Sequence, residues 1–195
     1  MITIELDPKY HIWEAALTRD ERPILKGVYI HKDGYMIATN GFILACIPCN
    51  INIDEDEVFE NCIVPADIFK KVNGKRELNI NLKEKTVKLF IDKNLNSYIG
   101  SSLIEGKYPE YNHIIPSLDD LEPINHINLN YALYTSLCKA IGSDYPYLMF
   151  TKQNSSVLVV NPEDKAFGLI MPVILKKLNE EILTYITNFS KDKNE

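Results

Sequence analysis

One arrangement of strands and a helix recurs three times along this chain of 195 residues, and the recurrence constrains the fold more than any other feature. Each time, a short apolar segment leads into a helix, and three strand-like segments follow. The repetition lies in the hydrophobic pattern and the turn residues, not in sequence identity. The pattern predicts an α+β protein made of three similar units, with enough chain to bury a sizeable core.

The first unit begins with the strand-like residues 2–6. Asp7 and Pro8 are typical of a helix N-cap and first turn, and apolar residues at helical spacing predict a helix from Lys9 to Thr18. Asp33-Gly34 predicts a hairpin turn between the first two of the strands that follow. These strands are expected at residues 25–31, 35–39 and 41–46.

The second and third units repeat this order. In the second, residues 61–64 lead into a helix that begins at Pro65 and ends near Val72. In the third, residues 126–129 lead into a helix over residues 130–140, which Gly142 ends. The expected strands are residues 77–82, 86–91 and 97–102 in the second unit and residues 147–151, 156–160 and 167–173 in the third.

These boundaries predict a domain organisation. Two units form a complete domain over residues 1–116, a connector follows at 117–124, and the third unit at 125–174 is half a domain. Residues 175–195 add a terminal helix and tail. The helix is expected to be amphipathic because its apolar residues are spaced three and four apart, at Leu178, Ile182, Tyr185, Ile186 and Phe189.

Composition narrows the function classes. A formal net charge of −6 argues against a protein that coats nucleic acid non-specifically, although it leaves room for a locally basic face. No apolar run is long enough to cross a bilayer, and residues 1–6 are too short and too acidic for a signal peptide. We therefore expect a cytoplasmic protein with no membrane partner.

The cysteines carry little chemistry. Cys46 and Cys49 have CxxC spacing, which occurs in zinc and redox sites. A zinc site would need a second pair, whereas Cys62 and Cys138 are isolated in the sequence. The sequence favours structural thiols over a metal site, and Cys46 lies in an apolar run where a free cysteine behaves as a small hydrophobe.

No catalytic pattern is present. The four histidines are scattered, without the pairing of a zinc-binding HxxxH or a triad, and the acidic run 54–60 lacks the glycine and spacing of a calcium loop. The sequence also lacks Walker and Rossmann glycine patterns. These observations predict a protein that is not an enzyme and needs no cofactor or metal.

Three motifs follow one another along the repeats. They are ATNGFILA at residues 38–45, EGKYPEY at 105–111 and LIMPV at 169–173. In order and spacing they resemble three motifs of the sliding clamps, the family of DNA polymerase III β-subunits. The family's motifs have the sequences ATDGHRLA, DGRFPDY and VVMPM. The resemblance covers that family's middle domain and the second half of its last. It implies the DNA-clamp fold of βαβββ units and a processivity factor for DNA replication.

In this family a groove between the middle and last domains binds short peptides of polymerases and other partners. The matching residues here come from all three motifs and are mostly apolar, as a groove for leucine and phenylalanine anchors requires. They are Thr39, Gly41, Phe42, Ile43, Leu44, Pro109, His113, Ile114, Leu169, Met171, Pro172 and Val173. The chain departs from the family at Phe42 and Ile43, which replace His-Arg, and at Ile174, which replaces a basic residue. These departures make the groove more apolar.

The resemblance also implies contact with duplex DNA, because basic residues on the family's repeat helices line the pore of a ring. Such side chains contact phosphates without reading sequence. The candidates in this chain are Lys9, Arg19, Arg22, Lys70, Lys71, Lys75, Arg76 and Lys139.

The leading hypothesis is a clamp-like scaffold that lies along or around duplex DNA and holds a polymerase or another partner through the groove. The alternative is a peptide-binding module, of phage or mobile-element type, that forms no ring and does not encircle DNA. Assembly is also open. Residues 175–189 are expected to cover the third unit's unpaired flank within one chain, and the alternative is a homo-oligomer in which four chains supply the twelve units of a ring.

Overall fold

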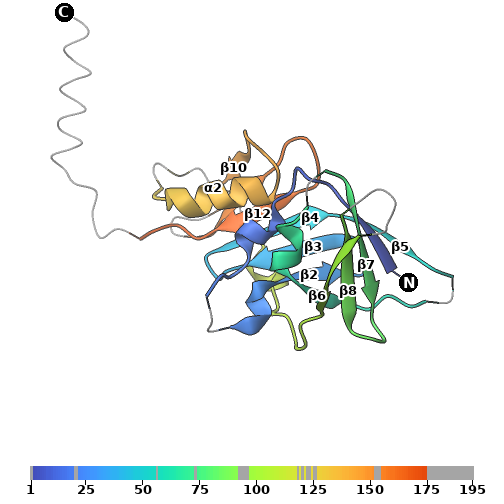
Figure 1. Cartoon of the computed structure of the whole chain (residues 1–195). Coiled ribbons are helices and arrows are strands. Elements are labelled where there is room, and N and C mark those ends of the chain that lie inside the picture. The colour runs from blue at the N-terminus through green and yellow to red at the C-terminus, as the bar shows by residue number, and fades with distance from the viewer. Residues whose placement is uncertain are drawn as a thin grey trace, which may run out of the picture.

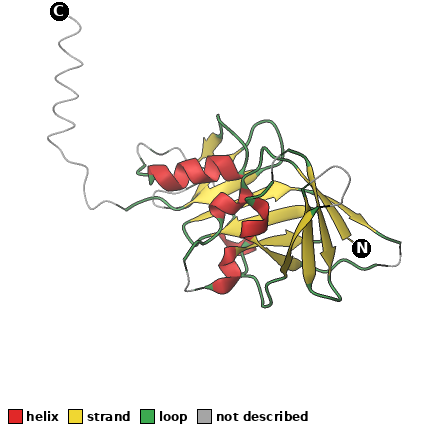
Figure 2. Ribbon diagram, viewed as in Figure 1, coloured by secondary structure: helices red, strands yellow, loops and turns green. Residues whose placement is uncertain are grey.

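The computed structural model describes residues 2–19, 22–55, 57–72, 74–91, 97–117, 119, 121, 124, 127–151 and 155–174. Two antiparallel sheets dominate it, and the short helices gather on one side of them (Figures 1 and 2). The strands of the first unit are β1 (Ile2–Leu6), β2 (Gly27–His31), β3 (Tyr35–Thr39), β4 (Ile43–Pro48) and β5 (Asn50–Ile53). The second unit contains β6 (Cys62–Pro65), β7 (Arg76–Asn81), β8 (Thr86–Phe90) and β9 (Tyr98–Ser102). The third contains β10 (Tyr147–Met149), β11 (Val157–Val160) and β12 (Phe167–Ile170).

The first two units complete each other by exchanging their leading strands. The five-stranded sheet has the order β5-β1-β7-β8-β9, so that β1 of the first unit lies beside β7 of the second. Conversely, β6 of the second unit pairs with β2 of the first. Each sheet therefore contains strands of both units, which are joined through the pairs β1–β7 and β2–β6.

The third unit extends the second sheet. That sheet has seven strands in the order β10-β11-β12-β4-β3-β2-β6. Its strands β12 and β4 are antiparallel, with Leu169 opposite Leu44 and Ile170 opposite Ile43. Residues more than 120 positions apart in the sequence thus lie side by side at this junction.

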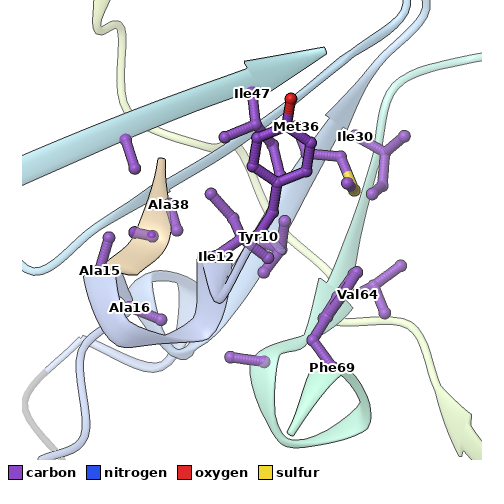
Figure 3. Close-up of a cluster of buried hydrophobic side chains, with 14 of the residues drawn as sticks. Tyr10, Ile12, Ala15, Ala16, Ile30, Met36, Ala38, Ile47, Val64 and Phe69 are labelled. Carbon is purple, nitrogen blue, oxygen red and sulfur yellow. The ribbon is translucent and has the colours of Figure 1, made fainter. Parts of the chain in front are cut away.

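Each unit contributes helical residues to the same layer. These are η1 (Ile12–Ala15), α1 (Ala66–Phe69) and α2 (Tyr131–Ala140), and η1 contacts both of the others. Asn130 caps α2 by accepting the Leu133 N–H, and Gly142, at φ +65°, follows its end. The side chains of Ile12 and Phe69 lie against Ile30 and Met36 of the sheet in the main core (Figure 3).

The first helix is much shorter than its hydrophobic spacing predicts. The expected helix over residues 9–18 is wrong, because the structure has only the 3₁₀ turn η1 there, with Ala16 already extended at ψ 155°. The His11 N–H donates to the Lys139 carbonyl and the Leu17 N–H to the Leu25 carbonyl, so tertiary hydrogen bonds replace helical ones here. A second 3₁₀ turn, η2 (Pro23–Lys26), occupies the start of the expected strand 25–31.

Other boundaries also differ. The helix expected to reach Val72 ends at Phe69, and isolated turns continue it. Residues 127–129 form no strand, and the last strand ends at Ile170 rather than Val173. The strand β5 was not expected. The hairpin turn at Asp33-Gly34 is confirmed, with Gly34 at φ +86°.

The predicted terminal helix at 175–189 lies outside the described residues. In the part of the chain that the structure does describe, no helix is both long and apolar enough to span a membrane.

Candidate functional site

The loop between β3 and β4 is fixed by side-chain hydrogen bonds. The Asn40 carboxamide oxygen accepts the N–H groups of Phe42 and Ile43, at 2.9 and 3.0 Å. The Thr39 hydroxyl donates to the Ile43 carbonyl at 2.6 Å and accepts the Gly41 N–H. Gly41 has φ +90°, a conformation that favours glycine. The turn leaves the Phe42 side chain 62% exposed.

The chain that follows β12 continues alongside this loop. The Met171 N–H donates to the Phe42 carbonyl at 2.9 Å, so the pairing of β12 with β4 extends beyond the last strand residue. Met171 and Val173 are 47% and 42% exposed, while Pro172 is half-buried. The loop and the end of β12 therefore present large apolar side chains to solvent next to each other.

A small apolar cluster lies beneath these exposed side chains, on the sheet face away from the main core. Leu44 and Leu169 are paired within it and are almost fully buried. Tyr108, from the linker after β9, packs against the cluster and stacks on Tyr29 at 4.8 Å between ring centres. Burial raises the pKa of Tyr108, and the backbone of Thr39 acts in the opposite direction. The linker is thereby held against the strands.

The remaining linker residues are on the surface. Pro109 and His113 are exposed, and Ile114, in the short 3₁₀ turn η3 (Asn112–Ile114), is 53% exposed. The His113 imidazole lies 3.5 Å from the Glu110 carboxylate. The Lys107 ammonium, which contacts the same carboxylate, lowers the pKa of Glu110. This edge of the site is polar and mixed in charge.

The large apolar residues predicted for the groove therefore separate into three groups. Leu44 and Leu169 form a buried floor, and Ile43 points into the main core on the opposite face of the sheet. Four others are large apolar side chains exposed to solvent, which we call together the apolar rim. It comprises Phe42, Ile114, Met171 and Val173.

The structure adds two residues that the motifs did not indicate. Leu25, in η2, is buried in the same cluster as Leu44 and Leu169. The Arg22 guanidinium lies against Gly41, since a Cβ placed there would be 3.0 Å from it. Arg22, predicted as a DNA contact, thus lies beside the loop of the candidate groove. No local pattern in the sequence indicates this, because the contact joins separate elements.

The other predicted DNA contacts come from several elements, and some of them already have partners within the chain. Lys9 donates to Asp164 at 2.7 Å, and this hydrogen bond raises the pKa of Lys9. Lys70 pairs with Asp67 at 2.6 Å. Arg76 is half-buried in β7, and its side chain donates to the Lys75 carbonyl.

Apart from Arg22, four predicted cations are exposed and carry no ion pair with any other described residue. Lys139 lies in α2, Lys71 and Lys75 follow α1, and Arg19 follows η1.

None of the four cysteines forms a disulfide. Burial raises the pKa of Cys46, Cys49 and Cys62 to about 12, so these thiols are mostly protonated at neutral pH. Within the described residues, no three His, Cys, Asp or Glu side chains are arranged to hold a metal ion.

Solved structures with a similar arrangement identify the fold as that of the DNA sliding clamps. DNA polymerase III subunit β from Borrelia burgdorferi, solved with a natural product, matches with a TM-score of 0.66 at 18% identity over 89% of this chain and 64% of that one. The sliding clamp of Bacillus subtilis matches with 0.62 at 18% identity, over 89% and 64% of the two chains. A Helicobacter pylori β clamp bound to a DNA ligase peptide matches with 0.64 at 14% identity, over 89% and 66%.

The family model for the central domain of the DNA polymerase III beta subunit matches residues 10–110, more than half of the chain. The chain therefore belongs to the DNA polymerase III beta subunit family. The beta sliding clamp of Borreliella burgdorferi is 31% identical over 105 residues, which are 50% of this chain and 26% of that protein. The chain spans less than two thirds of the length of each of these three solved clamps.

Proposed function

We propose that this protein is a non-enzymatic, clamp-like replication accessory protein that holds a partner through a short peptide. The peptide would lie on the apolar rim, across the junction of β4 and β12. A polymerase or another replication factor would supply the peptide. Membership of the family and a clamp relative solved with a DNA ligase peptide support this proposal.

The observation that carries the proposal is the hydrogen bond between Phe42 and Met171 at this junction. It fixes two large exposed apolar side chains side by side, over the buried pair Leu44 and Leu169. Soluble proteins seldom expose such neighbouring side chains unless they bind something. Methionine adapts to differently shaped anchors, which suits a surface that receives leucine and phenylalanine side chains.

A titration with a labelled DNA ligase peptide tests this proposal. Met171→Ala should weaken binding by about 1–2 kcal/mol, roughly five- to thirtyfold, because an apolar anchor contact is lost. Val58→Ala is the matched control, since Val58 is 81% exposed and lies outside the apolar rim. Equal affinities of the two variants, with unchanged circular dichroism, would refute the assignment of the site.

We further propose that the helical layer lies along duplex DNA without reading its sequence. The support is the group of four exposed cations, Arg19, Lys71, Lys75 and Lys139. Because such contacts release counterions, affinity for a duplex of any sequence should fall steeply between about 50 and 200 mM salt. Binding that is absent at low salt, or that does not change with salt, would contradict this part of the proposal.

A further inference from the structure

The residues that follow a unit's last strand form a backbone hydrogen bond with the same unit's leading segment. In the second unit the Ile104 N–H donates to the Ile63 carbonyl at 2.9 Å, and in the third the Val173 N–H donates to the Asn128 carbonyl at 2.8 Å. Ile63 and Asn128 each lie three residues before the first residue of their helix. Residues 127–129 therefore occupy the position that β6 has in the second unit, although they form no strand.

The strand registers of these two units agree residue by residue. In the second unit Leu78 lies opposite Leu89, and Leu89 lies opposite Ile99. Ile104 follows Ile99 by five residues. In the third unit Leu148 lies opposite Val159, and Val159 lies opposite Gly168. Val173 follows Gly168 by the same five residues. The three sheet strands of the third unit thus correspond in register to those of the second, with Leu148 in the place of Leu78.

The two units differ in the length of their helices and in what lies beside them. In the complete domain each leading strand pairs with the other unit's first sheet strand, with Ile63 opposite Tyr29 and Ile4 opposite Leu78. Among the described residues, no strand pairs with residues 127–129 or with the outer edge of β10.

Burial reflects this difference. Cys62 and Val64 of β6 are buried, whereas their counterparts Ile127 and Leu129 are only half-buried. Tyr147, at the start of β10, is 66% exposed. The third unit therefore has an unpaired apolar segment and an open strand edge close to it.

We propose that a second copy of this chain completes the third unit. Residues 127–129 of each copy would pair antiparallel with β10 of the other, as β1 and β6 do within the complete domain. The contact is isologous, because each copy gives and receives the same segment. This inference is independent of the proposed peptide and DNA binding.

The chemistry of the two segments suits a second copy. Neither residues 127–129 nor β10 contains a charged residue, so two copies meet without like-charge repulsion across the strands. Pro146, which has no N–H to donate, precedes β10 and removes no donor from it. An open edge of this kind favours pairing with another strand.

The packing limits how the two segments can align. Ile127, Leu129 and Leu148 all pack against the main core, so Asn128 lies on the other face, as Met149 does. A shift of one residue would reverse these faces. Asn128 therefore comes opposite Tyr147 or Met149 of the second copy, in two registers that differ by two residues.

Light scattering on the full chain gives the first test. We expect a mass of two chains of 22.4 kDa, or an even multiple of two. Tyr147→Asp should weaken the association at least about tenfold, because it places a charge in the interface. Val58→Asp is the matched control, because Val58 is also a highly exposed apolar residue and lies outside the third unit. A wild-type chain that is monomeric at every concentration overturns the proposal.

Cysteine cross-linking gives the second test. Asn128→Cys is combined with Tyr147→Cys in one variant and with Met149→Cys in another, and each is oxidised at neutral pH. Burial raises the pKa of the native thiols, so they should react slowly. We expect a covalent dimer from one double variant and none from the single variants. A two-chain mass without any such product would place the interface elsewhere.

Residues 175–189 of the same chain are the competing candidate to cover the open edge of the third unit. Light scattering distinguishes this possibility from a second copy. A monomer that begins to associate only when Ile182→Asp is introduced would identify this segment as the cover, and it would overturn the proposal.

Discussion

The complete domain and the third unit have the same internal arrangement, yet their apolar residues are buried to different degrees. Leu78 is fully buried because the exchanged strand β1 lies beside it, while its counterpart Leu148 is only partly covered. The comparison shows that a unit's own residues specify its sheet and helix. Closure of its leading segment depends on a neighbouring unit.

The largest expected effect compares these two leucines directly. Leu78→Ala should lower the free energy of unfolding by about 2–5 kcal/mol, because it leaves a cavity in a closed core. Leu148→Ala should cost about 1–2 kcal/mol, because less of its surface is removed from water. Urea unfolding at low protein concentration measures both, so that association does not contribute. Equal costs would contradict the difference between the two regions.

The junction between the regions should be sensitive to a single methyl group. A Cβ at Gly168, on β12, would lie 2.5 Å from the Leu44 carbonyl oxygen and would also clash with Leu137 of α2. Gly168→Ala should therefore cost about 1–3 kcal/mol and weaken peptide binding as β4 and β12 move apart. Gly100→Ala on β9 is the control, since its nearest neighbour is 3.5 Å away. Thermal unfolding compares the two variants, and similar midpoints would contradict close packing at the junction.

The fold of the complete domain follows well from the sequence, because alternating apolar residues at 78–82 and the turn at Asp33-Gly34 are local signals. The first helix does not follow, because the N–H groups of His11 and Leu17 bond to carbonyls of distant residues, which local spacing does not reveal. The strand β5 was missed for another reason. Its four residues, Asn-Ile-Asn-Ile, do alternate but are too few for a clear signal, and the pairing of β5 with β1 is a tertiary contact.

The candidate site was predictable only in part. The motifs around Gly41 and Met171 brought the loop and the last strand into one hypothesis, and the structure places them in contact. The sequence could not show that Ile43 faces the main core, since the turn decides which face each residue takes. It also could not place Arg22 beside Gly41, a contact between separate elements.

A smaller effect concerns the ion pair that ties the first unit to the third. Burial would raise the pKa of Asp164, but hydrogen bonds from Lys9 and Tyr10 outweigh it and lower the pKa. Asp164→Asn should cost about 1 kcal/mol at neutral pH, since the pair is partly exposed.

The pH dependence of this cost follows from the direction of the shift. A carboxylate whose pKa is lower in the folded state stabilises above its unfolded pKa of about 4, and the contribution is lost as pH falls through the folded value. The difference between wild type and variant should therefore be constant above about pH 5 and shrink below pH 4. A difference that grows on acidification would contradict the role of this pair. Urea unfolding between pH 3 and 7 measures it.

The smallest effect on stability comes from the exposed cations of the helical layer. Combined Lys71→Glu, Lys75→Glu and Lys139→Glu changes should alter the free energy of unfolding by less than about 0.5 kcal/mol each. The same changes should abolish duplex binding. Reversal of Lys83, Lys85 and Lys88, three exposed lysines of the β7–β8 hairpin, is the control. Equal DNA affinity of the two triple variants would exclude the helical layer as the DNA contact.

We propose that the partner peptide binds at the junction of β4 and β12, where the complete domain meets the third unit. Amide hydrogen exchange on the full chain, with and without a saturating DNA ligase peptide, tests it most directly. We predict added protection at residues 41–44 and 169–173 and little change in the five-stranded sheet. Protection confined to another surface, such as the cleft of about 480 Å³ beside Cys46, Tyr111 and Phe167, would contradict the claim.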